Sequence, residues 1–529
     1  MNYFSALFLG VFLPLTIIIY NLVPQKHRWK VLLASSYIFF WSISGKLLIY
    51  LLITTLIMYL FGQAFNYLQN KKKAKLKEID KEKKKEVKAY FNKRQKIFCV
   101  LAIIALLAIL IILKYSAFLT TNINSLMHTL NIEYQFDIPH LVMPIGISFY
   151  TLEAIAYIYD VYKGKIVADK NLPKLALFIG FFPKLMEGPI SRYSQIADSL
   201  WKCEKVTYER LTFGLQRILW GLLKKIVIAD RLNSFVANVF NNYSYYDGGV
   251  VALGMILYTI QLYMDFSGTI DVVIGIGEIF GVKLPENFRQ PFFSKTTSEF
   301  WKRWHITLGA WFRDYIFYPV SLTNKCKKFT SFSRKKWGNY YGPLISSSIA
   351  LFLVWLCNGI WHGSAWNYIF FGLYYFVLIM TGRFFEPIIE KITNKLHIDR
   401  KSFYYKVLQM IKTTCFVLVG ELFFRANGFL AGLEMFKKMI SEFSLESIFN
   451  KTILGFGMGR YDFLIVITML VVVFIISILK EKGINIREAL SKKNIIFRWA
   501  IFYALILIVI VFGAYGDGYV PVDPMYAEF

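Results

Sequence analysis

The segment Leu351–Trp366 reads LFLVWLCNGIWHGSAW, an apolar run that carries a histidine, His362, near its end. An ionisable side chain at membrane depth is costly and is usually functional. Imidazole titrates near neutral pH, so it can take a proton from a hydroxyl group and return it within one reaction cycle. We therefore take His362 as the first candidate for a catalytic base.

The chain as a whole has the composition of a polytopic membrane protein. Hydrophobic residues make up 56% of its 529 residues and its mean hydropathy is +0.46, more than an ordinary soluble core can bury. Shorter apolar runs at 142–162 and 173–188 are interrupted by Gly, Pro or charge and predict re-entrant or tilted segments. We predict an all-α protein with about ten to twelve membrane helices.

The net charge of +27 is explained by membrane topology before nucleic acid is considered. Between Lys71 and Lys96 the chain has thirteen Lys or Arg and four Asp or Glu, which predicts a cytoplasmic loop at 71–96. A hairpin at 31–62, turning near Gly45, would connect it to the basic stretch Gln25–Lys30. The N-terminus is then expected outside the cell membrane, with a helix at 97–117 leading to an outer loop at 118–141.

Other basic clusters predict further cytoplasmic ends. They lie at Lys224-Lys225, Lys325–Lys336 and Lys480–Lys493. Anionic lipid headgroups are a second interpretation of the 71–96 charge, and a positive inner face would also attract an anionic acyl donor. The first apolar stretch, Asn2–Leu22, has neither a basic leader nor a cleavage site, so we expect a retained helix.

Polar residues collect in the centre of the chain. Asp265 interrupts an apolar run, and the blocks WKRWHITL (301–308) and WFRDY (311–315) follow. In the first block, we predict that His305 shares one helix face with Trp301 and Leu308. Arginines can bind carboxylates or phosphates. The alternative is an interfacial helix with ion pairs at its edge, either Arg303–Glu299 or Arg313–Asp314.

Metal and disulfide chemistry have no support in the sequence. His305 and His362 lie 57 positions apart without an H-E-x-x-H cluster, so no metal site is predicted. The five cysteines show no C-x-x-C spacing. There is no Ser-His-Asp order and no G-x-S-x-G elbow, so the sequence does not indicate a serine nucleophile.

Six motifs occur in order along the chain. They are MPIGISFY (143–150), FFPKLMEGPI (181–190), DFSG (265–268), PENF (285–288), WKRWH (301–305) and WHG (361–363). Together they closely resemble the membrane-bound O-acyltransferase family, most strongly over 140–370. Within it, the chain is most similar to the branch of the alginate O-acetyltransferase membrane subunit, and next to the teichoic acid D-alanyl transferases.

The resemblance implies a helical fold around a central funnel, in which a cytoplasmic thioester donor meets an acceptor hydroxyl from the opposite face. The family's invariant histidine falls on His362 and its second, more variable position on His305. It implies four parts: N-terminal helices (1–140), a catalytic core (141–382), C-terminal helices (383–514) and an aromatic tail (515–529). Candidate funnel or substrate-positioning residues are Asp265, Trp301, Arg303, Trp304, Arg313, Asp314, Asn358, Trp361 and Ser364.

The expected donor is acetyl-CoA or an acyl carrier protein thioester, with no tightly bound cofactor. The expected partners are membrane lipid, a polysaccharide acceptor and an extracellular or periplasmic SGNH-type transferase, but no nucleic acid. The tail resembles terminal aromatic motifs with a central tyrosine, so Tyr526 is a candidate acyl relay, although Ala527-Glu528 departs from that pattern.

Three functions stay open at this point. They are O-acyl transfer to an exported or cell-wall polysaccharide, D-alanyl transfer to teichoic acid, and proton-coupled transport with His362 as a relay. A transporter would predict an inverted repeat, and the sequence shows no convincing duplication.

Overall fold

A computed structural model describes residues 1–516 and 518–522, and every regular element in this part of the chain is a helix. The α-helices are α1 (Leu13–Leu22), α2 (Gln25–Ser44), α3 (Leu48–Glu78), α4 (Lys84–Thr129), α5 (Ile147–Tyr162), α6 (Leu172–Gly180), α7 (Tyr193–Lys202), α8 (Tyr208–Leu222), α9 (Asp230–Asn241), α10 (Gly248–Ile279), α11 (Thr297–Arg303), α12 (Ile306–Phe312), α13 (Tyr318–Ser321), α14 (Asn324–His362), α15 (Trp366–Lys395), α16 (Phe403–Arg425), α17 (Phe429–Ser441), α18 (Glu446–Phe449), α19 (Arg460–Glu481), α20 (Ile486–Ser491) and α21 (Ile495–Phe512).

Within the described residues, eight helical stretches are long and apolar enough to cross a membrane. They are Gln25–Glu78, which contains α2 and α3, and the helices α4, α10, α14, α15, α16, α19 and α21. A shorter apolar helix spans Phe8–Leu22. The predicted all-α, polytopic membrane fold is confirmed, and the predicted turn falls at Gly45, where φ is 52°.

The chain divides into two compact units. Among the described residues, the first comprises Met1–Leu215 and Val273–Pro285, and the second comprises Gln216–Val272 and most of the chain after Glu286. The division passes through α8 and α10, so each of these helices contributes to both units.

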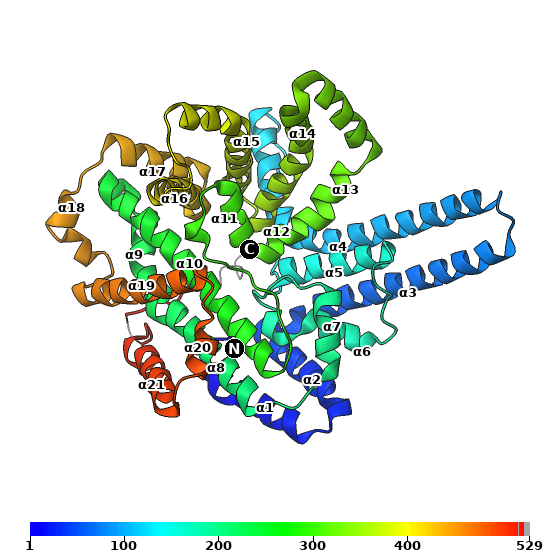
Figure 1. Cartoon of the computed structure of the whole chain (residues 1–529), viewed down its shortest axis with the longest axis horizontal. Coiled ribbons are helices and arrows are strands. Elements are labelled where there is room, and N and C mark those ends of the chain that lie inside the picture. Colours follow the sequence, from blue (N-terminus) through cyan, green and yellow to red (C-terminus); the bar gives the residue numbers. More distant parts are fainter. Residues whose placement is uncertain (517, 523–529) are drawn as a thin grey trace. The chain divides into compact units, whose positions relative to one another are not determined.

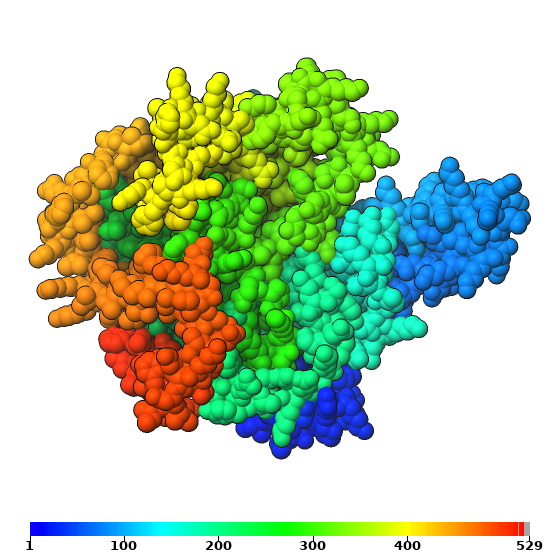
Figure 2. All heavy atoms as spheres, in the orientation of Figure 1, coloured from blue at the N-terminus to red at the C-terminus, as the bar shows by residue number. Residues whose placement is uncertain are grey.

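In the first unit, α3 and α4 form a long antiparallel hairpin, drawn in blue in Figures 1 and 2. The prediction of a loop at 71–96 is wrong, because helix continues to Glu78 and resumes at Lys84. This stretch contains twelve Lys and three Glu but neither Gly nor Pro, so its intrinsic helix propensity is high. Likewise α4 covers the predicted 97–117 helix and runs on to Thr129. Its 46 residues span about 69 Å, twice the hydrocarbon thickness.

The motifs near residues 146 and 187 build the tightly packed centre of the first unit. Gly146 has a φ of 79°, and a Cβ there would lie 2.0 Å from the Leu185 carbonyl oxygen, so only glycine fits. The Lys184 amine forms a buried ion pair with Glu153, whose other carboxylate oxygen accepts a hydrogen bond from the Ser191 amide (2.8 Å). The helix α5 lies within the segment 142–162, α6 overlaps the segment 173–188, and the re-entrant or tilted path predicted for these segments stays a prediction.

In the second unit, α14 packs against α15, and α15 packs against α16. A Cβ at Gly359 would lie 2.4 Å from the Tyr368 carbonyl oxygen, so the missing side chain lets the two helices approach closely. This contact lies three residues before His362. It fixes the end of α14 against the beginning of α15.

Candidate active site

His362 is the last residue of α14, and its side chain faces the protein interior. Only 4% of it is exposed. Its ring lies 5.6 Å from that of Phe371 in α15 and 5.2 Å from that of Phe424 in α16. The imidazole is therefore held by three helices and does not face lipid, as a base in a protein-lined site requires.

His305 lies in a break between α11 and α12, with a φ of 44°. The prediction that it shares a helix face with Trp301 and Leu308 is wrong. Asn287, from the PENF motif, interrupts the helix: its carbonyl oxygen accepts from the Ile306 amide (3.0 Å) and its side-chain oxygen accepts from the Thr307 amide (3.0 Å). The His305 side chain is 2% exposed and packs against Phe266 (4.9 Å between ring centroids).

Trp361 brings the two histidines to one place. Its ring centroid lies 5.8 Å from that of His305 and 5.0 Å from that of His362. Residues 57 positions apart thus contact the same indole, and the predicted pairing in one site is consistent with the structure.

Two further tryptophans line this region with aromatic surface. Trp301 contacts Trp355 (5.0 Å) and Tyr375 (4.7 Å), and Trp304 stacks on Phe300 (5.4 Å). Such packing excludes water from the surroundings of the histidines and fixes the backbone break between α11 and α12.

Asn358 is the polar side chain nearest to His362 along α14. It lies four residues earlier, so both side chains project from the same helix face. Asn358 is buried, and its side-chain oxygen has no hydrogen-bond partner among the described residues. Ser364 follows Gly363 just after the helix end and is half-buried. A buried amide oxygen without a partner is suited to accept a hydrogen bond from a substrate hydroxyl group, while the NH2 of the same side chain is a donor.

Asp265 is committed to an internal ion pair rather than to the histidine site. The Lys225 amine lies 2.6 Å from its carboxylate, 2.9 Å from Asp230, and donates to the Val522 carbonyl oxygen (2.7 Å). Lys224 and Lys225 were predicted to mark a cytoplasmic end, but both are buried within the helical stretch 208–241. Both amines are paired with carboxylates, Lys224 with Asp271 and Lys225 with Asp230 and Asp265, which offsets the cost of burying their charges.

The remaining charged candidates lie in ion pairs at more exposed positions. Arg303 bridges Glu299 and Glu481, both at 2.8 Å, and Arg313 pairs with Asp314 at 3.0 Å. Both ion pairs considered for an interfacial helix are therefore present. Of these contacts, the one between Arg303 and Glu481 connects α11 with α19.

The relay candidate Tyr526 lies outside the described residues. The segment before it is anchored on α9 and on the π-helix Leu223–Ala229 that precedes it: the Ala514 amide donates to the Ile226 carbonyl oxygen (3.0 Å), and Arg231 donates to the Tyr519 hydroxyl (2.9 Å). The Val522 amide donates to Asp230 (2.8 Å).

Sequence reasoning missed Glu421, a carboxyl group inside α16 that is 2% exposed. It precedes Phe424, which contacts His362, by three residues. The sequence could have revealed it, because Glu421 is a single acidic residue within an apolar run, and an ionisable residue in such a run was the reason for choosing His362. No group of three metal-ligating side chains occurs in the part of the chain described.

His305 makes stability depend on pH. Burial lowers the pKa of His305 to about 3, so the folded protein keeps this ring neutral while the unfolded chain protonates it below about pH 6.5. Stability is therefore lost as the pH falls. When the pH falls from 6.5 to 5, protonation of His305 in the unfolded chain should lower the free energy of unfolding of the wild type by about 2 kcal/mol. His305→Gln should not show this part of the decrease. Melting temperatures of the purified protein in detergent at both pH values measure this difference.

His128→Gln, at an exposed position, is the control and should melt like the wild type at each pH. Equal acid sensitivity of His305→Gln and wild type would contradict the buried, neutral state.

Comparison with known proteins agrees with this architecture. The membrane-bound O-acyltransferase family profile matches residues 166–334. The chain is 32% identical to the probable alginate O-acetylase AlgI of Pseudomonas syringae pv. tomato, over 83% of this chain and 75% of the relative. It is 30% identical to the peptidoglycan O-acetyltransferase of Helicobacter pylori, over 66% of each chain. It is 32% identical to the teichoic acid D-alanyltransferase of Bacillus subtilis, over 55% of this chain and 71% of the relative.

These similarities extend well beyond single motifs, and the described helices give the chain its multi-pass membrane character. They favour an enzyme over the proton-coupled transporter that the sequence left open. The chain belongs to the membrane-bound O-acyltransferase family and is an O-acyltransferase.

Proposed function

We propose that this protein moves an acetyl group from a cytoplasmic thioester toward hydroxyl groups of an exported or cell-wall polysaccharide, with His362 as general base. The observation that carries the proposal is the buried imidazole of His362, held at the end of α14 against Phe371 and Phe424. The acetyl group is chosen because the alginate and peptidoglycan relatives are named for O-acetyl transfer.

The chemistry needs few groups. His362 accepts the proton of an acceptor hydroxyl while the hydroxyl oxygen attacks the thioester carbonyl carbon. The carbon–sulfur bond of the tetrahedral intermediate then breaks, and the thiolate leaves with the proton that His362 held. Asn358 and the neutral His305 donate hydrogen bonds to the oxyanion in this proposal, with Ser364 as a further donor. No metal or tightly bound cofactor takes part.

The same proposal includes the topology of the reaction. The chain lies in the plasma or inner membrane with its N-terminus outside and the basic α3–α4 hairpin in the cytoplasm, following the positive-inside rule. Acetyl-CoA or an acyl carrier thioester reaches the site from the cytoplasm. The Tyr526 hydroxyl is the acceptor that attacks this thioester near His362, and the tyrosyl ester that forms is presented to an extracellular SGNH-type transferase. The four-part division of the chain belongs to this proposal as well.

D-alanyl transfer to teichoic acid is the second candidate, favoured by the 32% identity to the Bacillus subtilis D-alanyltransferase. The two candidates use the same base and differ in the acid released. Genes for a D-alanine ligase and carrier protein beside the gene for this chain would favour the second.

Base-labile ester content of the cell envelope, with and without this protein, tests the proposal. We expect acetic acid to be released by mild base from the wild-type envelope and to be absent without the protein. Release of D-alanine instead would replace acetylation with the second candidate. An unchanged ester content would overturn acyl transfer to envelope polymers. For the relay, mass spectrometry of the C-terminal peptide in active cells should find an acyl group on Tyr526.

A further inference from the structure

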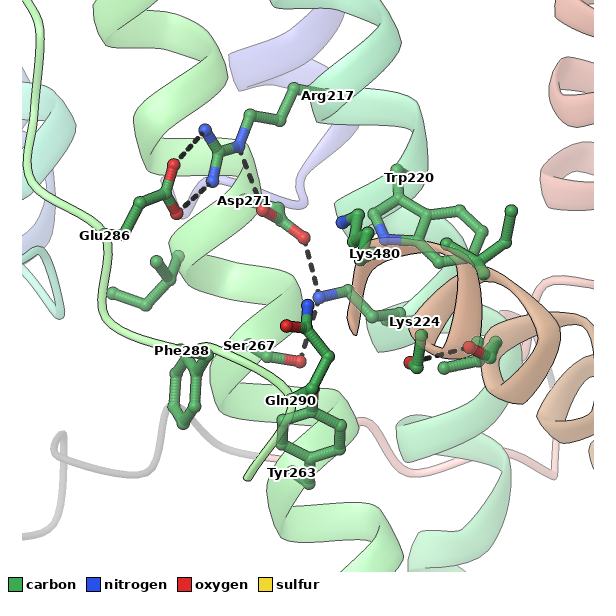
Figure 3. Close-up of a pocket in the computed structure, with 14 residues that line it drawn as sticks. Arg217, Trp220, Lys224, Tyr263, Ser267, Asp271, Glu286, Phe288, Gln290 and Lys480 are labelled. Carbon is green, nitrogen blue, oxygen red and sulfur yellow. Dashed lines mark hydrogen bonds and ion pairs between the residues drawn. The ribbon is translucent and has the colours of Figure 1, made fainter. Parts of the chain in front are cut away.

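A pocket in the second unit, lined by residues of α8, α10, α19, α20 and α21, has no role in the reaction proposed above. Its narrow inner end has a volume of about 60 Å³ and is lined by Lys224, Ser267 and Asp271 (Figure 3). Its wider outer part, about 490 Å³, adds apolar side chains from α19 and α21. That volume falls within the range of small-molecule sites.

The inner end holds a network of charged side chains, of which Arg217, Lys224 and Asp271 are largely buried and Glu286 is exposed. Asp271 accepts from Arg217 (2.9 Å) and lies 2.7 Å from the Lys224 amine, while Arg217 also binds Glu286 (2.6 Å). Figure 3 shows these groups pointing toward one another beside the pocket. Lys224 also donates to the Ser267 hydroxyl (2.9 Å), so the network connects α10 with the helical stretch that contains Arg217 and Lys224.

The pocket carries an excess of positive charge. Four cationic side chains line it, namely Arg217, Lys224, Lys480 and Arg487, against two acidic ones, Asp271 and Glu286. Lys480, at the end of α19, is close enough to interact electrostatically with Asp271 and Lys224, but it forms no ion pair within 4.0 Å among the described residues. An anionic group at this position would therefore gain a charge-assisted contact without displacing an internal one.

The outer part opens between helices whose sides face lipid. Val472 and Ile476 of α19 and Phe502 and Leu505 of α21 form its apolar wall. Only 17% and 11% of the apolar windows of these two helices are buried, the lowest values among the candidate spans described. A ligand with a hydrocarbon tail can enter between them from the bilayer, whereas a nucleotide would meet an apolar entrance.

We propose that this pocket binds one anionic phospholipid, with its phosphate on Lys480 and a hydrocarbon tail between α19 and α21. Basic pockets between membrane helices near the interface are suited to anionic headgroups. The bound lipid joins α19 and α21 to α10. The proposal is independent of which acyl group the enzyme transfers.

Lipid binding to the purified full-length protein tests this. Phosphatidylglycerol should raise the melting temperature and stay bound in native mass spectrometry, whereas phosphatidylcholine with the same tails should not. Lys480→Gln should weaken phosphatidylglycerol binding about tenfold, or about 1.4 kcal/mol. The matched control is Lys482→Gln, an exposed lysine two residues further on that does not line the pocket.

A second pair of variants tests the tail position. Leu505→Trp fills the apolar end and should abolish phosphatidylglycerol binding, whereas Leu507→Trp, on the exposed side of α21, should not. Equal behaviour of Lys480→Gln and Lys482→Gln, or equal binding of both lipids, would overturn the proposal. So would displacement of phosphatidylglycerol by acetyl-CoA, because the pocket would then serve the donor. None of these outcomes depends on ester formation, so failure here and failure of the proposed function are distinguishable.

Discussion

His362→Ala should lower acyl transfer by on the order of 10²–10⁴-fold, because a positioned general base contributes about that much to rate. This corresponds to about 2.7–5.5 kcal/mol of transition-state stabilisation. The side chain ends α14 and is enclosed by Phe371 and Phe424, so its loss removes the proton acceptor without breaking a helix. Envelope ester content in cells and transfer from labelled donor by purified protein both measure the effect.

Two controls separate chemistry from folding. His362→Gln keeps a polar side chain of similar size and should be equally inactive, while its melting temperature stays near that of the wild type. His128→Ala, at an exposed position in α4, should be fully active. Ester formation at the wild-type level in His362→Ala would show that another group takes the proton. Loss of polymer export along with the esters would point to transport instead.

Lys225→Met should give the largest loss of stability, about 3–5 kcal/mol, because removing one partner of a buried ion pair leaves the other charged and unpaired. Here two carboxylates, Asp230 and Asp265, would face each other without their shared cation. The Val522 carbonyl oxygen would lose its donor as well. Thermal unfolding of the purified protein in detergent measures the change.

The double variant Lys225→Met, Asp265→Asn should recover part of that loss, since it removes one of the two repelling charges. Lys205→Met, an exposed lysine, serves as the control and should melt like the wild type. If Lys225→Met and Lys205→Met melt at the same temperature, the ion cluster contributes nothing to the fold.

Hydropathy predicted the membrane helices well, because a span needs about twenty apolar residues whatever its neighbours are. The turn at Gly45 was predicted for a similarly local reason. The 71–96 segment was mispredicted because its charge was taken to indicate a loop, whereas helix propensity decides the conformation of a charged stretch outside the membrane. Outside the membrane, a segment can be helical while its charged side chains remain in water.

Non-local contacts account for the remaining differences. The break at His305 depends on Asn287, about twenty residues earlier, which takes the amides that would continue the helix. The Lys225–Asp265 pair joins residues forty positions apart, and no spacing rule in one sequence connects them. By contrast, the two histidines and Trp361 were selected from ordered motifs, and the structure brings them together around one indole.

The α3–α4 hairpin has a practical consequence for imaging this enzyme. Both helices continue without interruption to a turn between Glu78 and Lys84, so a folded protein inserted there would be carried on two rigid, paired rods. Such a fiducial would help align particles of a chain that is otherwise hidden by its detergent belt. Because the insertion lies outside the second unit, which holds both histidines, esterification by the fusion protein should remain intact.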